Sequence, residues 1–288
     1  MAAKRTPRVM ILADGSRPQF LAAVDRLRAT VEKHFDVVHV TLDLDDGLED
    51  VEADLAIVFG GDGSILRAAR MMGHHQRPVL GVNLGKLGFL AALQPEHLDE
   101  ALPHITADKH QIIKQLMFEC TLERAPRAGA SPPPPTILGL NEAEVLAGPP
   151  FALVDIQLYV DGELVTTYSC DGLIVSTPVG STAHNLSAGG PILRNNLQAF
   201  VFSPISPHTL TNRPVVESAD RTIEMVVPQP NEGTTLVVDG RVVATLGPDD
   251  RVRIVRSKAT FQLVHVPGQS YYRTLREKLG WGGQLKQS

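Results

Sequence analysis

Along the N-terminal third of the chain, short apolar runs alternate with longer stretches in which apolar residues recur at helical spacing. A short, continuous apolar run is typical of a buried strand, and the longer periodic stretches are typical of amphipathic helices. The predicted strands are 9–13, 37–40, 54–59 and 78–83, and the predicted helices are 17–34, 65–72 and 95–102. Strands that alternate with helices in this way predict a doubly wound, Rossmann-like α/β domain with a parallel sheet.

The pattern changes beyond residue 106, where strand-like runs follow one another with few helical stretches between them. The predicted strands here are 112–122, 136–146, 153–160, 164–168 and 170–176. Asp161-Gly162 separates two of them and predicts a tight hairpin, because both residue types tolerate the positive φ that such a turn requires. Four consecutive prolines, 132–135, predict an exposed, extended loop. This part of the chain is therefore predicted to be β-rich.

Helical spacing returns at the end of the chain, where Tyr271, Tyr272, Leu275 and Leu279 lie on one face. Because a lone helix must bury its apolar face, we expect it to pack back on the first domain. The predicted organisation is an α/β domain at 1–106, a β-rich domain at 107–267 and a C-terminal helix at 268–288.

Composition limits the classes of function. Of 288 residues, 43% are hydrophobic, and the net charge of -5 provides no basic surface for nucleic acid. Cys120 and Cys170 both lie in strand-like runs, which favours a reducing compartment over a disulfide framework. No apolar stretch approaches the roughly 20 residues that cross a bilayer, and none near the start resembles a secretory signal. We therefore expect a cytoplasmic protein with no membrane partner.

Two other classes of site lack their sequence signatures. The histidines show no spacing typical of a structural zinc site. Ser181 and Ser187 lack the surroundings of a hydrolase nucleophile. The sequence therefore favours neither zinc binding nor a serine hydrolase.

Gly60-Gly61-Asp62-Gly63-Ser64 lies between a predicted strand and a predicted helix. Glycines at such a turn let backbone N–H groups approach a phosphate, and the helix N-terminus favours an anion. Asp62 would repel phosphate unless it binds Mg²⁺ or accepts a proton from an attacking hydroxyl. The alternative is a tight structural turn in which Asp62 caps the helix. A second glycine-rich turn, 83–90, either lines a ligand or connects the domains.

Polar residues also interrupt the β-rich part. Asn141 and Glu142 lie within the predicted strand 136–146, where they suit a ribose or a base edge, or simply face solvent. The segment 170–191 is denser: its strand ends at Ser176, and Ser181 or Thr182 is predicted to cap a short helix. Hydroxyl groups, free helix N–H groups and Asp171 gathered in this way indicate a nucleotide site.

These motifs together resemble the NAD kinase family. Four blocks coincide in order: 60–63, 141–142, 171–191 and Asp239-Gly240, and the 81–90 segment is also similar. Phosphofructokinases and diacylglycerol-type lipid kinases share the first block alone. The likeness covers nearly the whole chain beyond residue 8 and implies an α/β N-terminal domain, a β-rich C-terminal domain and an active site in the cleft between them.

The resemblance implies transfer of a phosphoryl group from ATP to the adenosine 2′-hydroxyl of NAD, with Mg²⁺ or another divalent metal, in a homodimer or homotetramer. Asp62 would be the proton acceptor, and Gly60, Gly61 and Gly63 would contact ATP phosphates. Asp171 would reach the nicotinamide end. The implied NAD-binding residues are Asp62, Gly63, Arg67, Asn141, Glu142, Ser169, Asp171, Thr182, Ala183, His184, Asn185, Leu186 and Ser187.

Two positions depart from the family pattern. His184 stands where relatives usually carry Tyr, and it keeps a flat ring that could stack on adenine but can also titrate. Arg241 stands where many bacterial relatives have Gln. The alternatives to an NAD kinase are a lipid or sugar kinase with the same glycine turn and a non-catalytic NAD(H)-binding sensor. An assay with ATP and NAD separates them.

Overall fold

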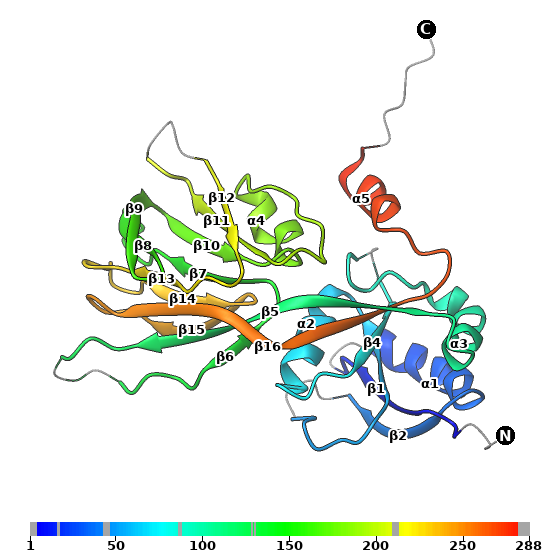
Figure 1. Ribbon diagram of the computed structural model, residues 1–288. Coiled ribbons are helices and arrows are strands. Elements are labelled where there is room, and N and C mark those ends of the chain that lie inside the picture. The colour runs from blue at the N-terminus through cyan, green and yellow to red at the C-terminus, as the bar shows by residue number, and fades with distance from the viewer. Residues whose placement is uncertain are drawn as a thin grey trace, which may run out of the picture. The chain divides into compact units, whose positions relative to one another are not determined.

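The computed structural model describes residues 5–15, 18–42, 47–85, 88–127, 129, 131–208 and 213–281. The chain forms two compact units, one of residues 1–114 and 261–288 and the other of residues 115–260. The division falls within two long strands, β5 (Gln111–Glu123) and β16 (Arg251–His265), which are drawn in green and orange in Figure 1. The predicted domain boundaries after residues 106 and 267 describe parts that fold independently, and they stay predictions.

A parallel sheet forms the centre of the first unit, in the order β2-β1-β3-β4. Its strands are β1 (Arg8–Ala13), β2 (Asp36–Thr41), β3 (Leu55–Gly60) and β4 (Pro78–Asn83). The end of β16 continues this sheet, because Gln262 and Leu263 pair in parallel with β4. β3 is buried along its whole length, as expected for a strand covered on both faces. The prediction of a parallel α/β domain is confirmed.

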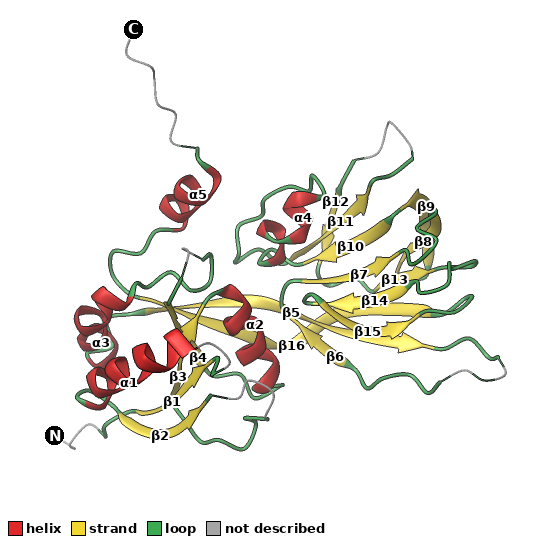
Figure 2. Cartoon of the chain, turned by 180° about the vertical axis from the view of Figure 1, so that it is seen from behind, coloured by secondary structure: helices red, strands yellow, loops and turns green. Residues whose placement is uncertain are grey.

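Helices of the first unit pack against its sheet and form an apolar core with the strands (Figure 2). Leu27 and Val31 of α1 share one core cluster with Leu98 and Leu102 of α3 and with the strands. The helices of this unit are α1 (Pro18–Glu32), α2 (Asp62–Met71), α3 (Leu98–Thr106), α5 (Tyr271–Leu279) and the single 3₁₀ turn η1 (Pro95–His97). The helices α1, α2 and α3 overlap the predicted helices 17–34, 65–72 and 95–102, but α2 begins earlier, at Asp62, and α3 begins later, at Leu98.

The C-terminal helix α5 has recognisable ends. The Ser270 hydroxyl accepts a hydrogen bond from the Arg273 N–H, and Gly280 ends the helix in the left-handed region at φ 65°. Leu275 is its buried residue. The helix therefore covers only the central part, Tyr271–Leu279, of the C-terminal segment 268–288 that was predicted to be helical.

Two sheets of the second unit enclose one apolar core. One sheet has the order β16-β13-β8-β9, with β5 pairing with both β16 and β6, and the other has the order β12-β11-β10-β7-β14-β15. The strands of the first are β6 (Ile137–Gly139), β8 (Val154–Val160), β9 (Glu163–Cys170) and β13 (Ile223–Val226). Those of the second are β7 (Glu142–Leu146), β10 (Gly172–Ser176), β11 (Ala199–Ile205), β12 (Val215–Ser218), β14 (Thr235–Val238) and β15 (Arg241–Thr245).

Strands β8 and β9 form the hairpin predicted from sequence. Asp161 and Gly162 occupy its turn with φ values of 52° and 83°. Both values lie in the left-handed region, which is why this pair of residues is favoured there. The hairpin prediction is confirmed.

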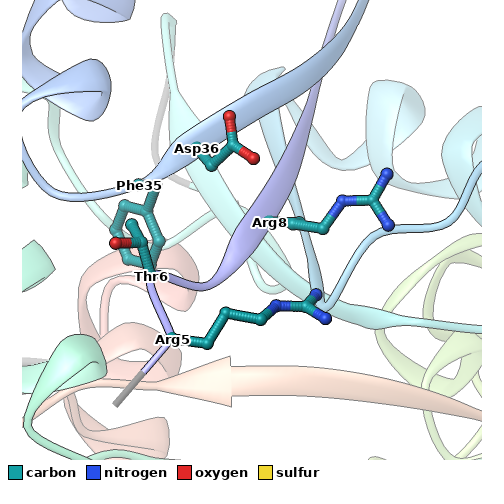
Figure 3. A pocket seen from close by; sticks show the side chains of 5 residues that line it. All are labelled: Arg5, Thr6, Arg8, Phe35 and Asp36. Carbon is teal, nitrogen blue, oxygen red and sulfur yellow. The ribbon is translucent and has the colours of Figure 1, made fainter. Parts of the chain in front are cut away.

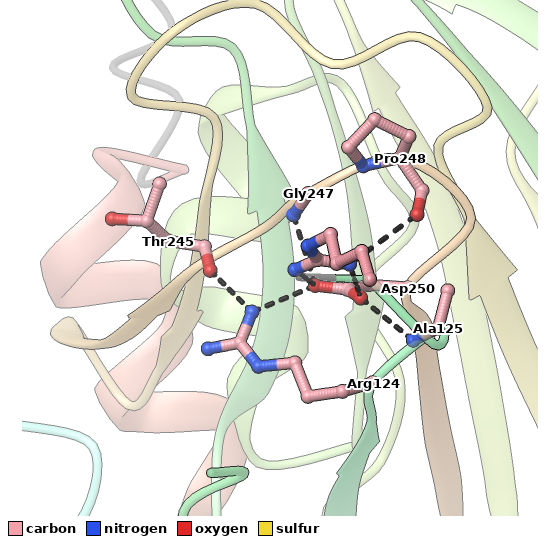
Figure 4. A network of polar contacts seen from close by, with 7 residues as sticks. Arg124, Ala125, Thr245, Gly247, Pro248 and Asp250 are labelled. Carbon is pink, nitrogen blue, oxygen red and sulfur yellow. Dashed lines mark hydrogen bonds and ion pairs between the residues drawn. The ribbon is translucent and has the colours of Figure 1, made fainter. Parts of the chain in front are cut away.

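The proline loop is anchored at its start by a buried carboxylate (Figure 4). The fully buried Asp250 side chain accepts hydrogen bonds from Arg124 Nη1 at 2.7 Å and Arg127 Nη2 at 2.9 Å. It also accepts from the backbone N–H groups of Ala125 and Gly247. Burial opposes ionisation, but the hydrogen bonds outweigh it and hold the pKa of Asp250 below its usual range. The network ties the end of β5 to the turn before β16.

Candidate active site

The glycine turn lies at the carboxyl edge of the parallel sheet, where β3 ends at Gly60 and α2 begins at Asp62. A Cβ on Gly60 would lie 2.2 Å from the Ser64 hydroxyl oxygen, so only glycine fits there. A Cβ on Gly61 or Gly63 would meet nothing within 4 Å. The turn therefore borders open space, and a phosphate could approach its backbone N–H groups.

Asp62 joins the two glycine-rich turns. Its carboxylate accepts hydrogen bonds from the backbone N–H groups of Phe89, Leu90 and Ala91 at 2.8, 2.9 and 3.0 Å. A Cβ on Gly88 would lie 2.1 Å from Asp62 Oδ1, so a glycine is required for this approach. About a third of the Asp62 side chain stays exposed (33%), so the carboxylate both holds the loop and remains accessible to a ligand.

The alternative in which Asp62 caps the helix is wrong, because Gly61 occupies the cap position of α2 and Asp62 is the first residue of the helix. Lys278 of α5 lies beside the same carboxylate, with its Nζ 4.0 Å from Asp62 Oδ2 and 4.7 Å from the centre of the Phe89 ring. Lys86 and Leu87 of the second turn lie outside the described residues.

The strand predicted over 136–146 is broken, and a distant carboxylate explains the break. β6 ends at Gly139 and β7 begins at Glu142. Asp239 accepts hydrogen bonds from the backbone N–H groups of Leu140, Asn141 and Glu142 at 2.9, 2.7 and 3.2 Å. These bonds satisfy a bend that would otherwise leave its N–H groups unpaired. Asn141 thus lies in the bend and Glu142 on the strand.

Glu142 carries a buried carboxyl group with an unused oxygen. The residue is 5% exposed, and its Oε2 has no hydrogen-bond partner in the described part of the chain. Burial, followed by the charges of Asp239 and Glu144, raises the pKa of Glu142 to about 9. A protonated carboxyl group can both donate and accept, which suits a ribose hydroxyl or a base edge.

Glu144 lies on the same face of β7, because alternate residues of a strand share a face. It is 3% exposed, and its Oε1 lies 2.6 Å from His184 Nδ1. Burial raises the pKa of Glu144, while the charge of His184 and its hydrogen bond act in the opposite direction. Glu144 was not predicted as a site residue, although the sequence carries a signal for it, a second acid two residues after Glu142 in an apolar strand.

The segment after β10 folds over this face and is fixed by internal hydrogen bonds. The Thr177 hydroxyl donates to the Leu140 carbonyl at 2.6 Å and accepts from the N–H groups of Val179 and Gly180. A Cβ on Gly180 would lie 2.3 Å from the Asn141 carbonyl oxygen. The segment therefore packs directly against the Leu140–Asn141 bend.

The predicted capping of the short helix is wrong. The 3₁₀ turn η2 spans Gly180–Thr182, helix α4 spans His184–Ser187, and Ala183 precedes α4 without a side-chain cap. The buried Ser181 hydroxyl instead donates to the Pro178 carbonyl at 2.6 Å and accepts from the Leu193 N–H at 2.9 Å. Its hydroxyl group holds the segment ends together and is not free for the helix.

Asn185 is fully buried at the centre of this segment. Its Nδ2 donates to the carbonyls of Ser181 and Pro191, both at 3.1 Å, and its Oδ1 accepts from the Ser203 hydroxyl at 2.6 Å. A Cβ on Gly190 would lie 2.1 Å from Asn185 Oδ1, so this position requires glycine. Both amide donors of Asn185 are thus used within the protein.

The other predicted residues are spread over both units. The structure brings Asn141, Glu142 and His184 together, but Asp171 precedes β10 while Glu142 pairs with Ser176 at the opposite end of that strand. Ser169 is the residue before the last one of β9, and its carbonyl accepts a hydrogen bond from the His208 N–H. Gly63, Asp171, His184 and Ser187 are exposed, and Arg67, Ser169, Thr182, Ala183 and Leu186 are half-buried.

A cavity of about 560 Å³ lies at the amino end of β1, away from the glycine turn (Figure 3). Arg5 and Arg8 line it, and each forms an ion pair, with Asp54 and Glu52 respectively.

Within the described ranges, no group of three or more His, Cys, Asp and Glu side chains could hold a metal ion. Of the helices that the structure describes, none has the length and apolar character to cross a membrane.

Comparison with known proteins places both units in one family. Residues 9–110 match the model of the ATP-NAD kinase N-terminal domain, and residues 140–266 match that of the C-terminal domain. The NAD kinase of Rhodopirellula baltica is 53% identical over 281 residues, which cover 98% of this chain and 89% of the relative. The NAD kinase of Shewanella frigidimarina is 40% identical over 233 residues, covering 81% and 74%.

Two solved structures are also similar. The NAD kinase from Archaeoglobus fulgidus in complex with ATP is 28% identical, with a TM-score of 0.71, and the match covers 96% of this chain and all of that one (100%). Yeast NADH kinase complexed with NADH has a TM-score of 0.85 at 22% identity, over 98% and 90% of the two chains. At that identity the second match shows the fold alone.

Proposed function

The chain belongs to the NAD kinase family, and we propose that it transfers the terminal phosphoryl group of ATP to the adenosine 2′-hydroxyl of NAD, giving NADP. The observation that carries this proposal is that the two matched domains together contain every candidate residue, from Gly60 to Ser187. The two-domain fold agrees with it, and no observation favours a lipid kinase, a sugar kinase or a sensor.

Asp62 is the proposed proton acceptor. A ribose hydroxyl is a poor nucleophile, so a base within hydrogen-bond reach accelerates its attack on phosphorus. The exposed part of the carboxylate supports this role, and its three N–H donors hold the carboxylate in a fixed place. Gly60, Gly61 and Gly63 are proposed to present backbone N–H groups to ATP phosphates. Arg67, about one turn into α2, is proposed as a basic contact to NAD.

Asn141 and Glu142 are proposed to bind NAD through its hydroxyl or base-edge groups. The buried, unpaired Glu142 Oε2 supports this role, because a lone polar atom costs stability until a ligand pairs with it. Thr182 to Ser187 are proposed to hold the adenosine, with Asn185 fixing the backbone of that segment. Ser169 and Asp171 are proposed to contact the nicotinamide end.

The divalent metal, Mg²⁺ in the simplest case, is proposed to arrive bound to ATP. Mg²⁺ commonly takes most of its ligands from phosphates and water and few from the protein. The one carboxylate at the glycine turn, Asp62, fits such a site without a dedicated cluster. When bound, the metal would neutralise charge on the transferring phosphoryl group.

Assembly and location are part of the same proposal. A homodimer or homotetramer is supported by exposed valines on the edge strands of the second sheet, such as Val216 (49%) and Val242 (70%). A cytoplasmic location is supported by Cys120 and Cys170, which are buried and free. Light scattering of the purified chain measures the assembly.

The experiment is a turnover assay with ATP and, separately, NAD, NADH and a diacylglycerol. Mass spectrometry and phosphorus NMR of the product identify which molecule gains phosphate and at which hydroxyl. We expect 2′-phosphorylated NAD. Phosphorylated lipid as the sole product, or NAD binding without turnover, contradicts the proposed function.

A further inference from the structure

The roles assigned above include His184 among the residues that hold the adenosine, but they use neither Glu144 nor its contact with the His184 ring. Glu144 lies almost fully buried on β7, and its carboxyl group meets the imidazole of a half-exposed histidine, whose side chain is 43% accessible. The ring is therefore held at Nδ1 from inside the protein, while Nε2, on the opposite edge of the ring, is left for a partner outside.

Whether His184 Nε2 is a hydrogen-bond donor or acceptor depends on how many protons the pair holds. If the pair holds one shared proton, either Glu144 is ionised and His184 is doubly protonated, or protonated Glu144 donates to Nδ1 of a neutral ring. In both states Nε2 bears a hydrogen and is a donor. If the pair loses that proton, ionised Glu144 accepts from Nδ1–H, and Nε2 becomes an acceptor. Two groups this close titrate as a pair.

The surroundings favour the protonated state of the pair. Glu142 lies on the same face of β7, and Asp239 lies beside Glu142 through the bend. No charged side chain comes from the described residues of the neighbouring elements β10, β11, β14 and η2, or from α4 apart from His184. In the segment that follows α4, the first charged residue is Arg194. A net negative charge on a buried pair next to these acids is costly, so the shared proton is retained.

We propose that Glu144 is a positioning residue that fixes the His184 ring so that its Nε2–H donates a hydrogen bond to an acceptor atom of NAD, an oxygen or a ring nitrogen. The proposal rests on the proposed NAD binding and adds a residue and an atom to it. It explains why a carboxyl group is buried on this face two residues after Glu142. It also gives NAD affinity a dependence on the proton that the pair shares, because alkaline loss of that proton removes the donor.

Two measurements test the proposal without requiring turnover. Calorimetry gives the dissociation constant for NAD between pH 6 and 9, and NMR of ¹³C-labelled histidine follows the His184 ring in the absence of ligand. The variants are Glu144→Gln, His184→Tyr and the double variant. His184→Tyr identifies the resonance and keeps a flat ring that does not titrate in this range, and Glu119→Gln, which keeps the acceptor for the Ser257 hydroxyl, is the matched control.

In the wild type, NAD affinity is expected to fall about tenfold as the pair loses its proton, the size of one charge-assisted hydrogen bond. Glu144→Gln removes the shared proton, so the pH dependence of the His184 resonance changes and the alkaline loss of NAD affinity disappears. His184→Tyr also removes it, and adding Glu144→Gln to that variant changes the pH profile no further. The control matches the wild type in both measurements.

Three results overturn the proposal. The first is a Glu144→Gln profile and resonance that both overlay the wild type. The second is a resonance that moves while the NAD profile does not, because the pair is then only structural. The third is a change in the NAD affinity profile caused by Glu144→Gln that is equally large in the wild-type and the His184→Tyr backgrounds. Failure of the proposed function is distinct, since it appears as absent turnover in the wild type.

Discussion

Glu142 should make the folded protein less stable as the pH rises, and Glu142→Gln should remove that loss. The pKa of the buried acid is raised from 4.5 to about 9, so the folded state holds a proton that the unfolded state has released. Between these values the unfolded chain binds fewer protons, and the free energy of unfolding therefore falls with pH. Stability is fully present below about pH 4.5 and is lost as the pH approaches about 9.

The size of the effect follows from the shift. Each unit of pKa difference corresponds to about 1.4 kcal/mol, so a shift of several units costs on the order of several kcal/mol at alkaline pH. Even one unit corresponds to about 2–4 °C in melting temperature for a chain of this size class. Glutamine has nearly the same shape and no charge, so Glu142→Gln should melt higher than the wild type at pH 8.5 and similarly at pH 5.

The assay is a set of thermal melts from pH 5 to 9 on the wild type, Glu142→Gln and Glu119→Gln. Glu119 is a half-buried carboxyl group on β5 whose acceptor oxygen for Ser257 is preserved in the glutamine variant. We expect only Glu142→Gln to flatten the pH dependence. A difference in melting temperature between Glu142→Gln and the wild type that is the same at pH 5 and pH 8.5 would refute the reasoning.

Three further predictions follow from other contacts. Asn141→Ala and Glu142→Ala should each weaken NAD binding by about 1.5–3 kcal/mol and ATP binding less; equal losses for both nucleotides in calorimetry would show that the pair is structural. Asp239→Asn should destabilise the chain by about 1–3 kcal/mol in urea unfolding, because its amide cannot accept from all three N–H groups; an unchanged midpoint would contradict the role of Asp239 in the bend. Asp250→Ala should cost about 3–5 kcal/mol, since Arg124 and Arg127 lose their buried partner, and a loss below 1 kcal/mol would argue against the network.

Much of the fold was predictable because its signals are local. The parallel strands β1, β3 and β4 are apolar runs that are almost fully buried, and Asp161-Gly162 specifies its hairpin by itself. The position of the glycine turn was predictable for the same reason, since it follows a strand and begins a helix, whereas its role as a ligand site stays a proposal.

The errors share one cause, which is dependence on residues far away in sequence. The break at Leu140 and Asn141 is imposed by Asp239, almost a hundred residues later, and no pattern within 136–146 reveals it. Ser181 was expected to cap a helix, but its hydroxyl group instead accepts a hydrogen bond from the Leu193 N–H, twelve residues later. The contact between Glu144 and His184 likewise joins two elements that only the tertiary fold brings together.

The central claim is that the chain phosphorylates NAD with Asp62 as the proton acceptor. Its most direct test is kcat for NAD phosphorylation by ATP in Asp62→Asn, with NAD affinity and melting temperature measured on the same sample. Asp25→Asn is the matched control, because it makes the same substitution at an exposed position of α1 in the same unit. We predict that Asp62→Asn lowers kcat by about 10²–10⁴ with NAD affinity retained, and that Asp25→Asn leaves kcat close to that of the wild type. A folded Asp62→Asn enzyme that keeps most of its kcat, or loses no more of it than Asp25→Asn, would contradict the account.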